Sequence, residues 1–163
     1  MEGPLWAPWR MQYIEAGSEP RACIFCEPSE PLSDAQRLVL HRSEHVFVLL
    51  NRFPYSPGHL MVAPYAHVGL VEELNTETQR DLMARISDSA RLLRAQYDCE
   101  GLNIGANIGR AGGAGFEAHV HFHLVPRWSG DHNFMTVVGE IRVIPKHLEK
   151  IYEELLERFQ ELA

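Results

Sequence analysis

Two periods of apolar residues run along the chain and predict its secondary structure. Short apolar runs at 38–40, 46–50 and 60–63 are separated by turn residues, as is typical of antiparallel strands joined by hairpins. From Thr76 to Tyr97 the apolar residues recur at every third or fourth position with charged residues between them. This period predicts an amphipathic helix, with Thr76 as its cap.

The remaining segments predict further strands, a loop and a second helix. The sequence LNIGANIG at 102–109 alternates well enough for a strand, and the glycines of 110–115 lead from it into a strand with three histidines. Prolines and serines at 27–36 indicate a loop. Pro145 is suited to open a last helix. The apolar face of that helix comprises Leu148, Ile151, Tyr152, Leu155, Leu156, Phe159 and Leu162.

These elements predict an α+β fold. Strands in meander order, without regular βαβ alternation, indicate an antiparallel sheet with one long helix and a C-terminal helix. The 163 residues suffice for one substantial core and are too few for two ordinary domains, so we expect a single domain over 1–163. The first twenty residues are too aromatic for a disordered tail, and we expect this arm to pack on the domain.

Three histidines, His119, His121 and His123, stand at every second position. Alternation on a strand places their side chains on one face, with neighbours roughly 6 to 7 Å apart. Pro126 lacks an N–H and is expected to close the strand, so that the histidines lie at its end. The residues that alternate with them, and that we expect to face the core, are Val120, Phe122 and Leu124. Clustered imidazoles beside glycine-rich backbone indicate a site for a phosphate or a metal.

Charge and composition narrow the classes of function. The formal net charge of −7 argues against a nucleic-acid partner, because proteins that bind its backbone use a basic stripe. Histidines, Arg127 and turn amides can still bind a small anion locally. No apolar run approaches the roughly 20 residues of a membrane span, and the first residues do not resemble a secretory signal. We therefore expect a cytoplasmic protein with no membrane partner.

Cys23 and Cys26 form a CxxC pair in a chain with three cysteines. In a cytosolic protein this spacing indicates metal or redox chemistry rather than a structural disulfide. A thioredoxin-like redox pair requires a βαβ context, which the surrounding sequence lacks. Metal binding is therefore the favoured interpretation of this pair.

The sequence around the histidines resembles a known family. HVHFHLVPR at 119–127, NRFPYSPGHLMVAPYAHV at 51–68 and NIGRAGGAG at 107–115 resemble segments of the histidine triad (HIT) superfamily of nucleotide hydrolases and transferases. The match runs from about Cys23 to Arg127, which marks the expected core of the domain. WAPWRMQYI near the start, and RWSGDHNFMTVVG and RVIP near the end, resemble a bacterial branch that contains diadenosine tetraphosphate phosphorylases.

The resemblance implies covalent cleavage of a dinucleoside polyphosphate of the diadenosine tetraphosphate type. His121 corresponds to a nucleophile that attacks the α-phosphorus and forms a nucleotidyl-histidine, which water or phosphate then cleaves. His123 and His59 correspond to donors to the α-phosphate oxygens. A divalent ion such as Mg²⁺ can accompany the polyphosphate. The alternatives are a nucleoside phosphoramidate or AMP-ester hydrolase of the same superfamily, and a nucleotide-binding module without turnover.

The resemblance also implies where the nucleotide binds. Asn51 replaces an aspartate that binds the ribose in many members, and an amide can take this role because it donates and accepts. Gly115 replaces a glutamine or serine, which removes a donor to phosphate and favours water as the acceptor. The other positions implied are Ile24, Phe25, Leu49 and Phe53 for the base, Asn107, Gly113 and Gly115 beside the phosphate, and Arg127 and Trp128 near the pocket. The apolar members of this set are equally typical of an ordinary core.

In zinc-bearing relatives two histidines join the CxxC thiolates, and the matching residues here are His67 and His119. The resemblance thus implies a structural Cys2His2 site for Zn²⁺ that ties the N-terminal segment to the sheet, with a vestigial site as the rival interpretation. Another hypothesis gives a catalytic metal to the three histidines of the strand, but these span roughly 13 Å. Family members usually pair through the long helix and an adjacent strand, so we expect a homodimer.

Overall fold

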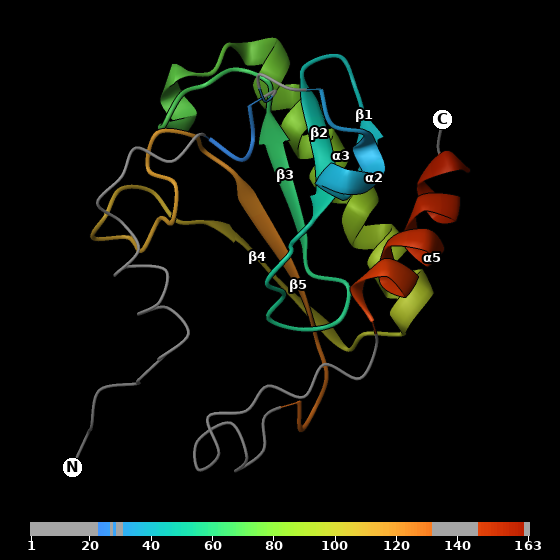
Figure 1. Cartoon of the computed structure of the whole chain (residues 1–163). Coiled ribbons are helices and arrows are strands. Elements are labelled where there is room, and N and C mark those ends of the chain that lie inside the picture. Colours follow the sequence, from blue (N-terminus) through green and yellow to red (C-terminus); the bar gives the residue numbers. More distant parts are fainter. Residues whose placement is uncertain (1–22, 27, 29–30, 132–146, 162–163) are drawn as a thin grey trace, which may run out of the picture.

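The computed structural model describes residues 23–26, 28, 31–131 and 147–161 (Figure 1). A five-stranded antiparallel sheet with the strand order β1-β2-β3-β5-β4 lies at its centre, which is the α+β fold predicted from the sequence. In chain order the elements are α2 (Asp34–Arg37), β1 (Val39–Arg42), β2 (Val46–Leu50), β3 (Leu60–Pro64), the 3-10 helix η1 (Val71–Glu73), α3 (Thr76–Tyr97), β4 (Gly101–Ala106), β5 (Phe122–Arg127) and α5 (Leu148–Gln160).

The longer helices cover one face of the sheet. α3 packs across β2, β3 and β5, and α5 packs on β1 beside α3 (Figure 1). Side chains on this face, among them Val48, Val62 and Leu124, form the main core with the two helices. The opposite face carries a smaller apolar cluster, which consists of Phe25, Val39, Phe47, Leu49, Met61 and Ala63. The two helices therefore do not cover the second face of the sheet.

The structure confirms the predicted hairpin and the long helix. β2 and β3 pair without interruption from Val46–Pro64 to Leu50–Leu60. α3 spans the predicted residues, but Asn75 is its N-cap, and the Asn75 side chain accepts a hydrogen bond from the Thr78 amide at 2.8 Å. The prediction that Thr76 caps the helix was wrong, because the residue before it already supplies a side-chain oxygen at the cap position.

Residues 34–37 form the short helix α2 where the sequence predicted a loop. Its N-cap is Ser33, whose hydroxyl accepts from the Gln36 amide at 3.3 Å, while the Gln36 side chain accepts from the Ser33 amide at 2.9 Å. This reciprocal pair is a capping box, and it starts a helix in a stretch whose prolines and serines pointed to a loop. α2 directly precedes β1 in the chain, and its last residue is Arg37.

β5 begins and ends later than predicted. It starts at Phe122, so among the three histidines only His123 lies within it, and near its start rather than its end. Pro126 does not close the strand but lies opposite Leu102 of β4. The pairing of β5 with β3 reaches only Leu124. Pro126 therefore lies beyond the residues of β5 whose backbone N–H groups could donate to β3, and its missing N–H does not interrupt that pairing.

The alternation predicted around the histidines is confirmed. The residues between them all contribute to the main core, namely Val120, Leu124 and the partly buried Phe122. A backbone hydrogen bond of 2.7 Å from Val120 to the Val68 carbonyl holds the segment before β5 in an extended path. The histidines consequently face the side of the sheet opposite to α3.

The C-terminal helix is confirmed as α5, which follows His147 and buries Ile151, Leu155 and Phe159. The aromatic arm predicted for the first twenty residues, and Pro145 as the residue that opens the helix, lie outside the described residues. Within the described part of the chain, no helix is both long and apolar enough to cross a membrane.

Candidate active site

Three imidazoles meet on the face of the sheet opposite to α3. His123 pairs across the sheet with Met61, a member of the smaller apolar cluster. The ring centroid of His123 lies 5.1 Å from that of His59 and 4.9 Å from that of His121. The structure therefore brings together the three residues predicted to be catalytic, with His123 between the other two.

The turn before β3 positions His59, which is fully buried. Gly58 has a φ of +78°, and a Cβ at this position would lie 2.5 Å from the Tyr97 ring, so the turn requires glycine. Tyr55 stacks on the His59 ring with 4.8 Å between centroids. The Tyr55 amide also donates to Nδ1 of His59 at 3.0 Å.

These contacts determine which ring nitrogens carry protons. A backbone N–H can only donate, so Nδ1 of His59 accepts and the neutral ring carries its proton on Nε2. That Nε2 lies 3.0 Å from Nδ1 of His123, to which it donates. His123 then carries its own proton on Nε2, and an N–H of this kind can donate to an anionic oxygen.

His121 has the opposite tautomer. Its Nδ1 lies 2.9 Å from the backbone carbonyl of His119 and must donate to it, which leaves a lone pair on Nε2. The side chain is 5% exposed, and burial lowers the pKa of His121, an effect that the hydrogen bond to the carbonyl partly opposes. The Phe25 ring stacks on this imidazole with 4.5 Å between centroids. The arrangement holds a neutral, unprotonated nitrogen beside His123.

The CxxC pair and two histidines form a second cluster next to these rings. The ligand atoms of Cys23, Cys26, His67 and His119 all lie within 4.8 Å of one another. Four sulfur–nitrogen and nitrogen–nitrogen distances in the cluster are 3.4, 3.1, 3.7 and 3.3 Å. Around a tetrahedral zinc ion with ordinary bond lengths, two nitrogen ligands lie about 3.3 Å apart and a sulfur and a nitrogen about 3.6 Å apart. Both the donor set and its spacing therefore fit Zn²⁺.

His119 is oriented for metal binding by its second ring nitrogen. Nε2 donates to the Pro64 carbonyl at 2.9 Å, so the unprotonated Nδ1 faces Cys23, Cys26 and His67. Metal-bound histidines in proteins are commonly oriented in this way. Burial also lowers the pKa of His119, which favours the neutral form that a metal requires.

The residues predicted to bind the base divide into two pairs. Phe25 and Leu49 are buried in the smaller apolar cluster, whereas Ile24 and Phe53 are 51% and 70% exposed. Asn51, predicted at the ribose, lies 3.5 Å from Nε2 of His59 through its Nδ2. The Asn51 side-chain oxygen accepts from the Phe53 amide at 2.9 Å. The structure thus places Asn51 beside the histidines, and its contact with the ribose stays a prediction.

The predicted phosphate loop lies alongside His121. Asn107 directly follows the Ala106–Phe122 pair of β4 and β5, so the register brings it level with His121. Its amide donates to the Gly113 carbonyl at 3.4 Å, and Gly113 adopts a φ of +82°. Gly115 is exposed in the same loop.

Arg127 and Trp128 are not brought to the histidines. Arg127 forms an ion pair with Asp131 at 2.6 Å and donates to Asn103 at 2.9 Å. It lies four residues beyond His123 along β5, a separation of roughly 13 Å. The indole N–H of Trp128 donates to the Tyr97 carbonyl at 3.3 Å.

Sequence analysis missed two residues at the site. Tyr55 lies in the segment that was interpreted only as a turn, although an aromatic residue four positions before a candidate catalytic histidine is a usable signal. Arg37 donates to the carbonyls of Phe25 and Cys26. No local sequence pattern predicts this contact, because it joins two separate segments.

Comparison with known proteins agrees with this geometry. A family model described as the HIT domain matches residues 33–130. The chain belongs to the HIT family. The AP-4-A phosphorylase of Mycobacterium tuberculosis is 39% identical over 151 residues, which cover 88% of this chain and 77% of that protein. The bis(5'-adenosyl)-triphosphatase of Dictyostelium discoideum is 28% identical, and the match covers 78% of this chain and 84% of that one.

A solved structure supports the same assignment. A zinc-bound histidine triad family protein from Mycobacterium smegmatis superposes with a TM-score of 0.62 and 27% identity. The match covers 77% of this chain and 85% of the other. This HIT-family chain therefore shares its fold with a protein that binds zinc.

Proposed function

We propose that this HIT-family protein cleaves dinucleoside polyphosphates of the diadenosine tetraphosphate type at the α-phosphate, through a covalent nucleotidyl-histidine on His121. The protein is a nucleotide-processing enzyme, like its relatives named AP-4-A phosphorylase and bis(5'-adenosyl)-triphosphatase. The observation that supports the mechanism best is the 2.9 Å hydrogen bond from His121 to the His119 carbonyl. That bond leaves the other ring nitrogen of His121 as a nucleophile beside His123.

The first step transfers the nucleotidyl group to the protein. Nε2 of His121 attacks the α-phosphorus, a P–N bond forms, and the bond from phosphorus to the bridging oxygen breaks, which releases the rest of the polyphosphate. The Nε2 proton of His123, whose Nδ1 accepts from His59, stabilises the charge that develops on the phosphate oxygens. Fixed donors of this kind act in the transition state without further rearrangement.

The second step releases the nucleotide. An oxygen of water or of inorganic phosphate attacks the same phosphorus, the P–N bond breaks, and His121 returns to its neutral form. A 39% identical relative is named a phosphorylase, which supports phosphate as the acceptor. The absence of a side-chain donor at Gly115 favours water instead. The acceptor is therefore the part of the reaction that most needs direct measurement.

The proposal includes a structural Zn²⁺, held by Cys23, Cys26, His67 and His119. A bound ion ties the segment around the cysteines to the ends of β3 and β5. Reduced thiolates at these positions accord with the cytoplasmic location expected from the sequence. The named relative with bound zinc supports this assignment.

A second copy of the chain is the proposed partner. β4 forms an edge of the sheet, and Ile104 on this strand is 45% exposed on the side of α3. Met83 on α3 is 56% exposed. Pairing of two copies along β4 and α3 would satisfy the edge that β4 forms among the described strands, and it would cover both side chains. Light scattering of Ile104→Lys should then report a monomer where the unaltered chain gives a dimer.

Product analysis tests the reaction directly. Diadenosine tetraphosphate is incubated with the protein in the presence and absence of phosphate, and the products are separated. ADP and ATP that appear only with phosphate identify a phosphorylase, whereas AMP and ATP under both conditions identify a hydrolase. Absence of any nucleotide product would contradict the proposed activity.

A further inference from the structure

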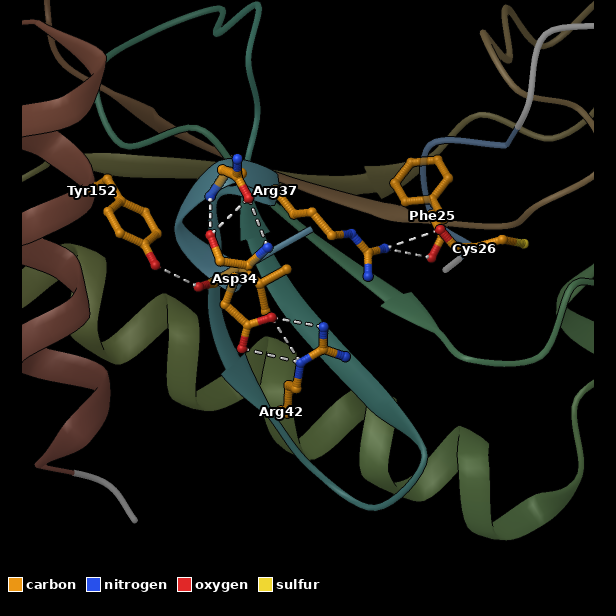
Figure 2. A network of polar contacts seen from close by, with 9 residues as sticks. Phe25, Cys26, Asp34, Arg37, Arg42 and Tyr152 are labelled. Carbon is orange, nitrogen blue, oxygen red and sulfur yellow. Dashed lines mark hydrogen bonds and ion pairs between the residues drawn. The ribbon is translucent and has the colours of Figure 1, made fainter. Parts of the chain in front are cut away.

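Arg37, the last residue of α2, reaches the loop that carries the two cysteines (Figure 2). Its Nη2 donates to the backbone carbonyl of Phe25 at 3.1 Å and to that of Cys26 at 3.2 Å. A single guanidinium nitrogen therefore holds two consecutive carbonyls of the loop. Arg37 contacts the backbone of Phe25 and Cys26, and so it holds main-chain atoms of the loop, whereas metal ligation would act at the two sulfurs.

The base of this contact is itself anchored. The capping box at Ser33 fixes the start of α2, and Asp34 forms an ion pair of 2.7 Å with Arg42 of β1 (Figure 2). The guanidinium of Arg37 also lies 5.7 Å from the centre of the Phe47 ring, where cation–π attraction limits its movement. Arg37 thus links α2 and the Phe47 ring to the cysteine loop.

The loop residue that Arg37 holds touches the nucleophile. The Phe25 ring is 3% exposed and lies at 30° to the His121 imidazole, with 4.5 Å between centroids. Phe116 packs edge-on against Phe25 with 5.9 Å between centroids, and it also borders the smaller apolar cluster. Phe25 therefore stacks on one face of the imidazole.

We propose that Arg37 is a positioning residue for His121 and acts through Phe25. The hydrogen bond to the His119 carbonyl holds His121 at one ring atom, which still permits the ring plane to tilt. The stacked Phe25 ring restricts that plane, and Arg37 fixes the backbone from which Phe25 extends. Displacement of a reacting atom by about 1 Å can slow a reaction by about 100-fold, so the orientation of this ring controls the rate. The inference rests on the proposed function of His121.

The test compares Arg37→Met with Arg91→Met in the full-length, zinc-saturated protein. Methionine keeps an apolar stem over Phe47 and removes the guanidinium donors. Arg91 is the control, because it lies on α3, on the other face of the sheet, and forms an ion pair of 2.7 Å with Asp88 rather than a contact with α2 or the loop. The first measurement is the NMR position of the His121 ring protons without substrate, and the second is the rate of nucleotidyl transfer to His121 in a single turnover.

Stacking on Phe25 shifts the His121 ring resonances upfield in the unaltered protein and in Arg91→Met. In Arg37→Met this shift decreases, and transfer slows by at least about tenfold while KM and zinc content stay close to those of the unaltered chain. The inference is overturned if the resonances of Arg37→Met match those of the unaltered protein, or if Arg91→Met slows transfer equally.

Phe25→Leu provides a second test that does not depend on the fold of the arginine variants. Leucine keeps the apolar packing of the smaller cluster and lacks the ring, so nucleotidyl transfer slows as in Arg37→Met. Transfer at the unaltered rate would overturn the inference. If the unaltered protein forms no nucleotidyl-histidine at all, the proposed function fails, and the NMR comparison still decides whether Arg37 orients His121.

Discussion

The backbone carbonyl of His119 accepts the Nδ1 proton of His121 at 2.9 Å. The side chain of the same His119 faces the two cysteines and His67. One residue thus contributes its side chain to the metal cluster and its backbone to the nucleophile. The two clusters are adjacent, and substitutions can separate the role of each.

Replacement of His121 by asparagine removes the nucleophile. The amide of Asn can still donate to the His119 carbonyl, so the fold should be retained while kcat falls by at least about 1,000-fold. The measurement is the steady-state rate with diadenosine tetraphosphate. His45→Asn, in the turn between β1 and β2, is a matched histidine control and should keep the full rate. Comparable rates in the two variants would show that His121 does not carry the reaction.

Removal of a cysteine ligand tests the zinc site. Cys23→Ser should lose the one zinc ion that we expect per chain and should lower the melting temperature, because metal binding contributes folding free energy. Metal content is measured by elemental analysis. Cys99→Ala removes a buried cysteine outside the cluster and should retain the ion. Zinc that remains in Cys23→Ser together with activity would favour a catalytic metal on the three histidines instead.

His41 should make the fold less stable in mild acid. Burial lowers the pKa of His41, and the positive charge of Arg85 on α3, at 3.4 Å, lowers it further. The carboxylates of Asp81 and Asp88 partly oppose this shift. The His41 ring also stacks on Phe159. As the pH falls below the ordinary value of 6.5, the unfolded chain takes up a proton that the folded chain does not.

The free energy of unfolding should therefore decline from about pH 6.5 downward, and His41→Gln should show a flatter decline. Urea titrations between pH 8 and pH 5, analysed for both proteins, provide the comparison. The two curves would run parallel if His41 does not titrate differently in the folded and unfolded states.

Tyr152→Phe tests how α5 is attached to the sheet. The Tyr152 hydroxyl donates to the Val39 carbonyl at 3.0 Å, at the point where the pairing of β1 and β2 shifts register (Figure 2). Its loss leaves a buried carbonyl without this donor and should cost about 1 kcal/mol. For a chain of this size we expect the melting temperature to fall by about 2 to 4 °C. An unchanged melting temperature would mean that the bond contributes no net stability.

The elements that the sequence predicted well are those determined by local patterns. α3 depends on a helical period that needs no information from other segments, and the β2–β3 hairpin depends on two apolar runs and a turn. The start of β5 was misplaced because strand limits depend on pairing, here of Phe122 with Val62 of β3. The Asn75 cap was missed by one residue for a local reason, since two adjacent polar residues compete for the position.

The histidines and the metal cluster were predicted as sets, and the structure shows how they are connected. The resemblance implied both sets, but no motif indicates that Phe25 lies on His121 or that Arg37 holds the Phe25 backbone. These contacts join segments that are far apart in the chain. Their prediction requires the packed structure, because neither residue type is distinctive in its local sequence.

The stereochemical course at the α-phosphorus tests the covalent mechanism most directly. A substrate with a chiral, isotopically labelled α-phosphorothioate is cleaved, and the configuration of the released nucleotide is determined. Two successive in-line displacements, with His121 as the intermediate acceptor, predict retention of configuration. Inversion would mean that water or phosphate attacks the substrate directly and would contradict a nucleotidyl-histidine on the pathway.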